Sequence, residues 1–251
     1  MKLTPWTPTD AHAAPLVELV QRAEAKLLEE LAPELRADSL ASALRAFPRI
    51  SAVLERWLGP KVVASTVEAA GEQARAASDR EWAEQVSAAV GQRVALDTQP
   101  SRELLQAWIA ANTARIQSLR NENLRRIRDD IETAVLSEAR PEELAAKWQR
   151  EGLPTLNGTL RGRATVIARD QLGKLAGQLA EHQQRSLGIS VYTWDVRPAI
   201  SREHRREHLA RAGRRFEWDH PPVDGHPGAA VLCQCRAVAE ADPAALRRRL
   251  G

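Results

Sequence analysis

Apolar residues recur at three- and four-residue steps through most of the first 187 positions, the spacing of one face of an amphipathic helix. The first such run follows Asp10, a favoured helix cap, and consists of Leu16, Leu19, Val20, Ala23, Leu27 and Leu31. Pro33, Pro48 and the Gly59-Pro60 pair then interrupt the pattern. The spacing therefore predicts a helix over about 10–31, followed by a broken region and an Ala-rich helix over about 61–91.

A second set of helices is predicted beyond a turn at 97–100, whose sequence is DTQP. Ser101 is expected to cap a helix that runs to about residue 139. Its apolar stripe consists of Leu105, Ile109, Ile116, Leu119, Ile127, Ile131 and Val135. Pro141 suits the first turn of a short helix, and Gly188 suits the left-handed position after a helix over about 160–187.

The pattern changes after Gly188. The stretch ISVYTWDV (189–196) is rich in β-branched and aromatic residues and predicts a strand. We expect a short polar helix over 201–213, a second strand over 214–218, a Pro-rich loop, a third strand over 230–240 and a short C-terminal helix. The expected core of this end is Val191, Tyr192, Trp194, Leu209, Phe216, Trp218 and Leu232.

These patterns predict a mainly α fold with a small α+β C-terminal end, that is, long amphipathic helices followed by short antiparallel strands. We expect a helical N-terminal region over 1–100 that docks on a partner. A second part over 101–251 would hold helices over 101–187, the α+β end over 188–240 and a tail. Aromatic residues make up only 4% of the 251 residues, which argues against a β-sandwich or β-barrel. The sequence also shows neither a membrane span nor a signal peptide, so we expect the chain to be made in a cytoplasm.

Charge is unevenly distributed along the chain. Residues 161–251 hold 16 Lys and Arg against 10 Asp and Glu, and 15 of the 16 are Arg. Arginine favours bidentate contact with phosphates and carboxylates, so these residues indicate either a solvated basic face or a surface for DNA or an acidic partner. The candidate DNA-binding residues are Arg161, Arg163, Arg205, Arg206, Arg214 and Arg215.

Both cysteines and four of the six histidines fall within 32 residues. His204 and His208 share a helix face, and with Cys233 and Cys235 they are suited to a structural zinc site, for which His226 and His220 are further candidates. The favoured alternative is that no cofactor binds and that packing on the 160–187 helix stabilises this end. A Cys233–Cys235 disulfide would be strained.

Enzyme motifs are weak or missing. Asp219-His220 with the later cysteines faintly resembles an HNH nuclease core, but the last Asn of the chain is Asn157, so the second required ligand is missing from the motif. A metal-dependent nuclease or toxin-like enzyme is therefore retained only as the alternative function. Phosphate-binding loops, GxSxG and HExxH are absent from the sequence, and no catalytic residue is assigned.

Motifs in the C-terminal half, taken in order, are similar to those of the phage Mu F-like minor head proteins. They are Ala164-Thr165-Val166-Ile167-Ala168-Arg169-Asp170, Leu187-Gly188-Ile189, Tyr192-Thr193-Trp194, Arg205, His208, Gly213, Phe216, Pro221-Pro222, His226-Pro227 and Cys233-Gln234-Cys235-Arg236. The resemblance covers about residues 101–240.

The resemblance implies a non-enzymatic minor structural protein that acts in procapsid assembly and head morphogenesis. It implies a location in the virion, in the head interior or at the portal vertex. Its implied partners are the portal protein, other phage head proteins and, in some members, packaged double-stranded DNA, with no membrane partner.

Overall fold

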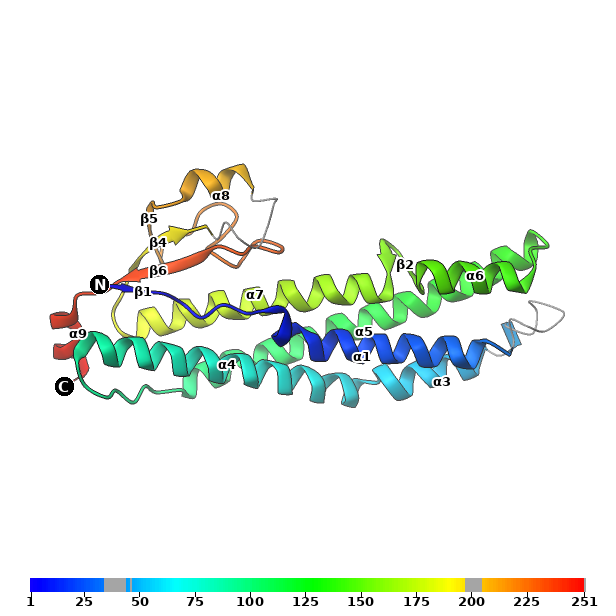
Figure 1. Cartoon of the computed structure of the whole chain (residues 1–251), viewed down its shortest axis with the longest axis horizontal. Helices are drawn as coiled ribbons and strands as arrows, with labels where there is room; N and C mark the ends of the chain where they lie inside the picture. The colour runs from blue at the N-terminus through cyan, green and yellow to red at the C-terminus, as the bar shows by residue number, and fades with distance from the viewer. Residues whose placement is uncertain (34–43, 46, 197–204, 251) are drawn as a thin grey trace. The chain divides into compact units, whose positions relative to one another are not determined.

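The computed structural model of the chain describes residues 1–33, 44, 45, 47–196 and 205–250. Within these residues the protein is mainly helical with short antiparallel strands, mostly in the C-terminal part, which confirms the predicted fold class (Figure 1). The chain packs as two compact units. Unit 1 comprises Met1–His12, Gly71–Trp108 and Arg169–Gly251, and unit 2 comprises Ala13–Ala70 and Ile109–Ala168. Each unit contains residues from both sides of residue 100, and the division at that position stays a prediction.

The predicted long helices are present with boundaries within a few residues of those expected. They are α1 (Asp10–Leu31), α4 (Pro60–Val90), α5 (Gln99–Leu136), α6 (Pro141–Glu151) and α7 (Leu160–Ser186). A further helix, α3 (Phe47–Leu58), contains Pro48 in its first turn, where proline removes no intrahelical hydrogen bond. None of the described helices combines the length and apolar character that a membrane span requires.

Unit 2 is built from the apolar stripes of its helices. All six residues of the α1 stripe are buried, and so are Ile116, Leu119, Ile127 and Ile131 of the α5 stripe. Val135 was expected to continue this stripe but is 36% exposed, because it lies one residue before the end of α5. The buried Glu24 on α1 accepts a hydrogen bond from the Leu153 amide at 2.8 Å. Leu153 lies just before a hairpin of β2 (Pro154–Thr155) and β3 (Gly158–Thr159), which the sequence did not predict.

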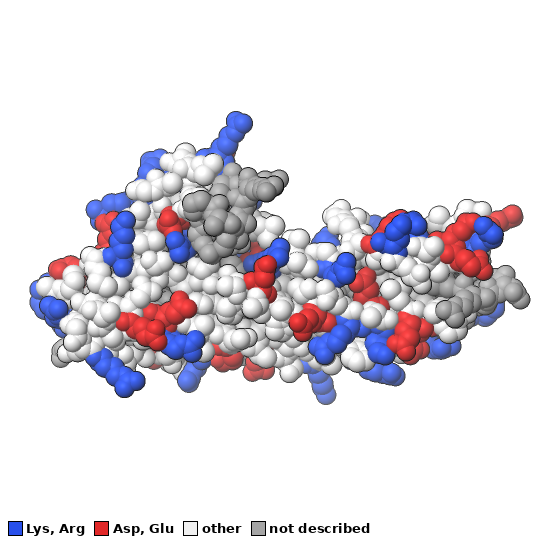
Figure 2. Space-filling model, in the orientation of Figure 1, with Lys and Arg blue, Asp and Glu red and all other residues white. Residues whose placement is uncertain are grey.

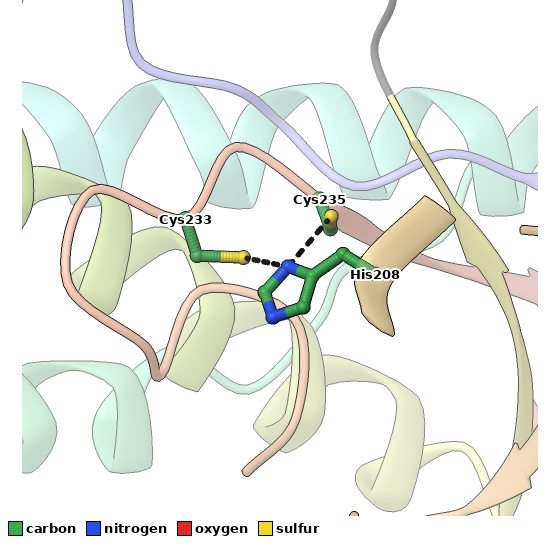
Figure 3. Close-up of side chains that lie close together, drawn as sticks. All are labelled: His208, Cys233 and Cys235. Atoms are coloured by element: carbon green, nitrogen blue, oxygen red, sulfur yellow. Dashed lines mark hydrogen bonds between the residues drawn. The ribbon is translucent and has the colours of Figure 1, made fainter. Parts of the chain in front are cut away.

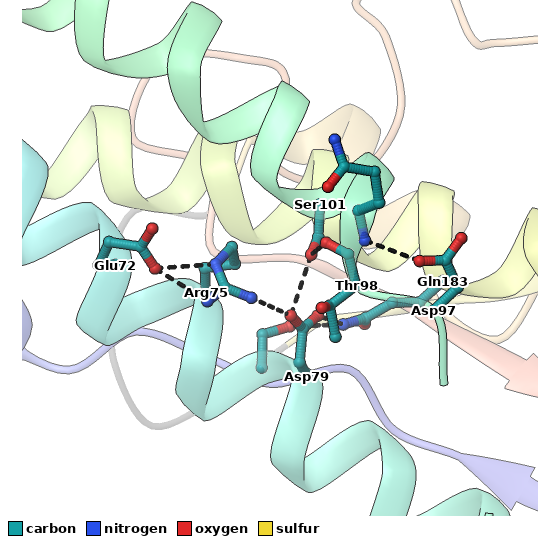
Figure 4. Close-up of polar contacts among 9 residues, drawn as sticks. Glu72, Arg75, Asp79, Asp97, Thr98, Ser101 and Gln183 are labelled. Atoms are coloured by element: carbon teal, nitrogen blue, oxygen red, sulfur yellow. Dashed lines mark hydrogen bonds and ion pairs between the residues drawn. The ribbon is translucent and has the colours of Figure 1, made fainter. Parts of the chain in front are cut away.

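A polar network joins α4 to the start of α5 and to α7 in unit 1 (Figure 4). The Asp79 carboxylate accepts hydrogen bonds from Arg75 at 2.6 Å, Ser101 at 3.0 Å and Gln183 at 3.1 Å. Ser101 therefore ties α5 to α4 and does not cap its own helix as predicted. The cap is supplied earlier, because the Asp97 side chain accepts a hydrogen bond from the amide of Gln99 at 2.9 Å.

The small sheet of unit 1 has the strand order β1-β6-β4-β5, with every pair antiparallel. Its strands are β1 (Lys2–Leu3), β4 (Val191–Asp195), β5 (Arg215–Glu217) and β6 (Arg236–Glu240). The third predicted strand is therefore shorter than expected, and Cys233 and Cys235 lie in the loop before it. Strand β1 was not predicted, since two residues carry no periodic signal, and it pairs the start of the chain with β6.

The core of the α+β end differs in part from the predicted set. Tyr192, Trp194 and Trp218 are buried as predicted, whereas Leu209 is 51% and Leu232 is 44% exposed. Helix α8 (Arg206–Arg211) turns His208 inward, and this leaves its neighbour Leu209 on the outer side. The α8 helix is also shorter than the predicted 201–213, of which residues 201–204 lie outside the described chain. A last helix, α9 (Pro243–Leu250), follows β6.

Candidate functional site

The loop that carries the two cysteines lies on one face of α7. Asp170 is buried, and its Oδ1 accepts a hydrogen bond from the Leu232 amide at 2.8 Å, while Lys174 contacts Oδ2 at 2.7 Å. Gly177 leaves room for the loop backbone, because a Cβ atom there would lie 2.6 Å from the carbonyl oxygen of Pro227. Leu232 adopts a left-handed backbone with φ of 54°, which sets the turn into Cys233. Helix α7 therefore fixes the position of the cysteines.

Three potential metal ligands converge above this face (Figure 3). The Nδ1 atom of His208 lies 3.5 Å from Cys233 Sγ and 3.4 Å from Cys235 Sγ. All three side chains are buried, and both cysteines are free thiols. Of the residues predicted to bind metal, the structure therefore brings together His208, Cys233 and Cys235.

The opposite nitrogen of His208 is held by a carboxylate. His208 Nε2 lies 2.8 Å from Asp224, which also accepts a hydrogen bond from Arg211 at 2.6 Å. This arrangement assigns the proton to Nε2 and leaves the Nδ1 lone pair facing the sulfurs. Burial alone raises the pKa of Asp224, but the hydrogen bonds from His208 and Arg211 hold it below the usual value. Trp194 packs edge-on against the imidazole, with ring centroids 5.2 Å apart, and so restricts its rotation.

The two thiols affect each other's ionisation. The hydrogen bond between them lowers the pKa of Cys233, and the Gly228 amide, which donates to Cys233 Sγ at 3.4 Å, lowers it further. The same contact between the thiols, followed by burial, raises the pKa of Cys235. The ionisation of one thiol therefore depends on that of the other.

Two of the other predicted histidines, His226 and His220, make different contacts. The Nδ1 atom of His226 lies 2.8 Å from the Tyr192 hydroxyl oxygen, and its Nε2 atom lies 3.1 Å from the Trp218 carbonyl oxygen. Both ring nitrogens therefore contact other protein groups. Burial lowers the pKa of His226. His220 is exposed and pairs with Glu217, and its neighbour Asp219 pairs with Arg185. His204 lies outside the described residues.

The six candidate DNA-binding arginines fall in two places. Arg161 and Arg163 lie on the first turn of α7 in unit 2, where the first is exposed and the second half-buried. The remaining four are exposed and belong to the α+β end of unit 1: Arg205, Arg206, Arg214 and Arg215. Figure 2 shows basic side chains projecting over the part that carries α8. The structure thus places four of the six in one small region, and their role stays a prediction.

Two carboxylates of this region were missed by sequence reasoning. Asp224 orients His208, and Asp170 holds the loop before Cys233. Asp170 stands in the motif Ile167-Ala168-Arg169-Asp170, which the resemblance had already singled out without a structural role. Asp224 follows two prolines in a loop, where a carboxylate gives no distinct signal.

Comparison with known proteins gives a family match that covers this region. Residues 125–238 match the family described as phage Mu protein F like protein, a stretch that includes α6, α7, β4, β5 and the three converging ligands. A protein of Haemophilus influenzae described as uncharacterized is 31% identical over 134 residues, which cover 53% of this chain and 28% of that protein. The chain thus spans little more than a quarter of the length of that relative. No solved structure matches the chain significantly.

Proposed function

Because residues 125–238 match the phage Mu protein F-like family, we propose that this protein is a structural component that acts in the assembly of a tailed-phage head. The family match is the observation that carries the proposal. It covers α7, which positions the cysteine loop, and strands β4 and β5 of the small sheet. The role is one of binding other head proteins, with no chemical reaction assigned to the chain.

Within this assembly role, we further propose that the protein binds the portal vertex inside the procapsid. Long helices with charged outer faces suit side-by-side docking on other helices. On α5, for example, Arg126 and Arg128 form exposed ion pairs with Asp129 and Glu132. Exposed pairs of this kind contribute little stability, so a partner is able to replace them at low cost.

Co-expression with the other head proteins of the same phage tests the assembly role. The protein is expected to sediment with procapsids, and removal of the portal protein from the mixture is expected to abolish this association. Sedimentation with portal-free shells would contradict the portal proposal alone. A protein that never sediments with any head assembly, and whose absence leaves assembly unchanged, would contradict the head function itself.

A second finer proposal is that the α+β end binds packaged double-stranded DNA. Its support is the exposure of the four arginines of that end, which suit sequence-independent contact with phosphates. Such binding releases counterions and so weakens steeply as salt rises.

A charge-matched pair of variants tests DNA binding. One replaces Arg205, Arg206, Arg214 and Arg215 by alanine. The control replaces four arginines of unit 2 that are engaged in exposed ion pairs, Arg126, Arg128, Arg140 and Arg150. Retention on DNA at low salt is expected to be lost in the first variant and kept in the second. Equal loss in both would indicate a response to net charge and would contradict a site on the α+β end.

A further inference from the structure

The two nitrogen–sulfur separations among the converging ligands match those that a bound metal ion imposes. A tetrahedral zinc at about 2.3 Å from sulfur and about 2.0–2.1 Å from nitrogen holds these two atoms roughly 3.5–3.6 Å apart. The His208 Nδ1 atom lies 3.5 Å from Cys233 Sγ and 3.4 Å from Cys235 Sγ. Both sulfur–nitrogen distances thus agree with coordination to one common ion.

Hydrogen bonding alone accounts less well for this arrangement. With its proton on Nε2, His208 has one lone pair on Nδ1, yet two thiols lie at nearly equal distances from it. One thiol is able to donate to that lone pair, and the other is left with the hydrogen bond between the two cysteines. A single cation between the three atoms satisfies all of them at once. We propose that His208 Nδ1, Cys233 Sγ and Cys235 Sγ bind one zinc ion.

The residues around the three ligands have the contacts expected of a zinc site. Histidine ligands of zinc usually donate their other N–H to a carboxylate, which fixes the ring and its tautomer. Asp224 occupies that position, and Arg211 in turn holds Asp224. The Gly228 amide points at Cys233 Sγ, as backbone donors do when they stabilise a thiolate.

Contacts within the protein hold the ligands in position without a metal ion. Asp170 on α7 holds the Leu232 amide, and the loop backbone rests on Gly177, so the cysteine loop is positioned by contacts that need no ion. Trp194 restricts the imidazole from the other side. Zinc would connect α8 to the segment before β6 and so fasten together an end whose buried core is small. This proposal does not depend on the function proposed above.

Charge and coordination number follow from the ligand set. Binding of Zn²⁺ releases the remaining thiol protons to solvent, and the two thiolates then neutralise the ion, which suits a buried site. Thiolate and imidazole together favour zinc over magnesium or calcium, which prefer oxygen ligands. Three protein ligands leave one tetrahedral position, which a water molecule fills.

Metal analysis of the reduced full-length chain tests the site. We expect about one zinc per chain after purification without chelators. Replacement of zinc by Co²⁺ is expected to give the near-ultraviolet thiolate-to-cobalt band and the visible bands of a tetrahedral ion. His208→Gln and Cys235→Ser are expected to lose the metal and both sets of bands, whereas His220→Gln, which changes an exposed histidine, is expected to keep them.

A second variant covers the case in which the ligand variants fail to fold. Asp224→Asn keeps the shape of the side chain and leaves all three ligands in place, and we expect it to weaken zinc affinity by about 10–100-fold. A folded, reduced wild-type chain that contains no zinc and gives no cobalt–thiolate band would overturn the proposal. So would a Cys235→Ser variant that is folded and keeps the wild-type cobalt spectrum.

Discussion

Two glycines one turn apart on α7 face the same loop and differ in the space they leave. A Cβ atom at Gly177 would lie 2.6 Å from the Pro227 carbonyl oxygen, whereas at Gly173 the nearest atom, the carbonyl oxygen of Cys233, is 3.5 Å away. Gly173→Ala is expected to raise the free energy of unfolding by about 0.5–1 kcal/mol through helix propensity. Gly177→Ala is expected to lower it by about 1 kcal/mol or more, since the loop must move. Urea denaturation of the two variants checks this, and equal stabilities would show that the loop yields freely.

His226 makes the stability of the α+β end depend on pH. Its Nδ1 accepts a hydrogen bond from the Tyr192 hydroxyl, which requires the neutral ring, and its Nε2 donates one to the Trp218 carbonyl. Burial lowers the pKa of His226, Glu181 opposes this shift and Arg185 adds to it. Since the folded pKa lies below the unfolded value of about 6.5, the unfolded chain binds the proton first. This contribution to stability is present above that value and is lost as the pH falls through the folded pKa.

The expected result is a free energy of unfolding that decreases as the pH falls from neutral through the lowered pKa of His226. His226→Gln removes the titrating ring, so its dependence on pH is expected to be flatter than that of the wild type. His220→Gln changes an exposed histidine and is expected to keep the wild-type slope. Denaturant titrations at several pH values provide the measurement. If His226→Gln kept the wild-type dependence of the free energy of unfolding on pH, His226 would not be the titrating group.

At the scale of elements, one buried side chain on α7 holds the small sheet. Gln184 is fully buried, donates to the Ala237 carbonyl at 2.6 Å and accepts from the Trp218 indole at 3.1 Å. Gln184→Leu would leave both partners buried and unsatisfied, at a cost of about 1–3 kcal/mol for each group. Gln178→Leu is the control, because Gln178 is exposed on the same helix. In thermal unfolding, Gln184→Leu is expected to have a clearly lower melting temperature than Gln178→Leu. Similar melting temperatures for the two variants would contradict this role of Gln184.

The length of an element determines whether its sequence pattern is long enough to predict it. The stripes of α1 and α5 span several turns, and each turn repeats the same signal, so the helices were predicted within a few residues. Strand β1 has two residues and β5 has three, too few to repeat a period of two. Helix α8 is similarly short, and its inward residue is set by what packs against it.

At the scale of the whole molecule, the start of the chain belongs to the C-terminal sheet. Leu3 on β1 pairs with Ala239 on β6 and is fully buried beside Trp82 and Leu246. Leu3→Ala is therefore expected to lower the free energy of unfolding by about 2–5 kcal/mol. Val223→Ala, at a fully exposed loop position, is expected to change it by less than about 0.5 kcal/mol. Chemical denaturation followed by tryptophan fluorescence measures both, and a small effect at Leu3 would show that β1 is dispensable.

The sequence by itself determined the class of fold and the long helices, and it indicated the family whose model matches residues 125–238. These properties depend on local periodicity and on the order of short motifs, and both can be read directly from the amino-acid sequence. The residue types of the His/Cys group were also visible, since both cysteines and four histidines fall within 32 residues.

Only the tertiary structure decided which histidine faces the cysteines. His208 and His226 are both close to the cysteines in sequence, but α8 and Asp224 aim His208 at the sulfurs, whereas Tyr192 and Trp218 hold His226 elsewhere. The same is true of Asp170, whose buried carboxylate holds a loop 62 positions away. Contacts between residues far apart in sequence depend on packing across several elements, and a local pattern does not encode the direction of a side chain.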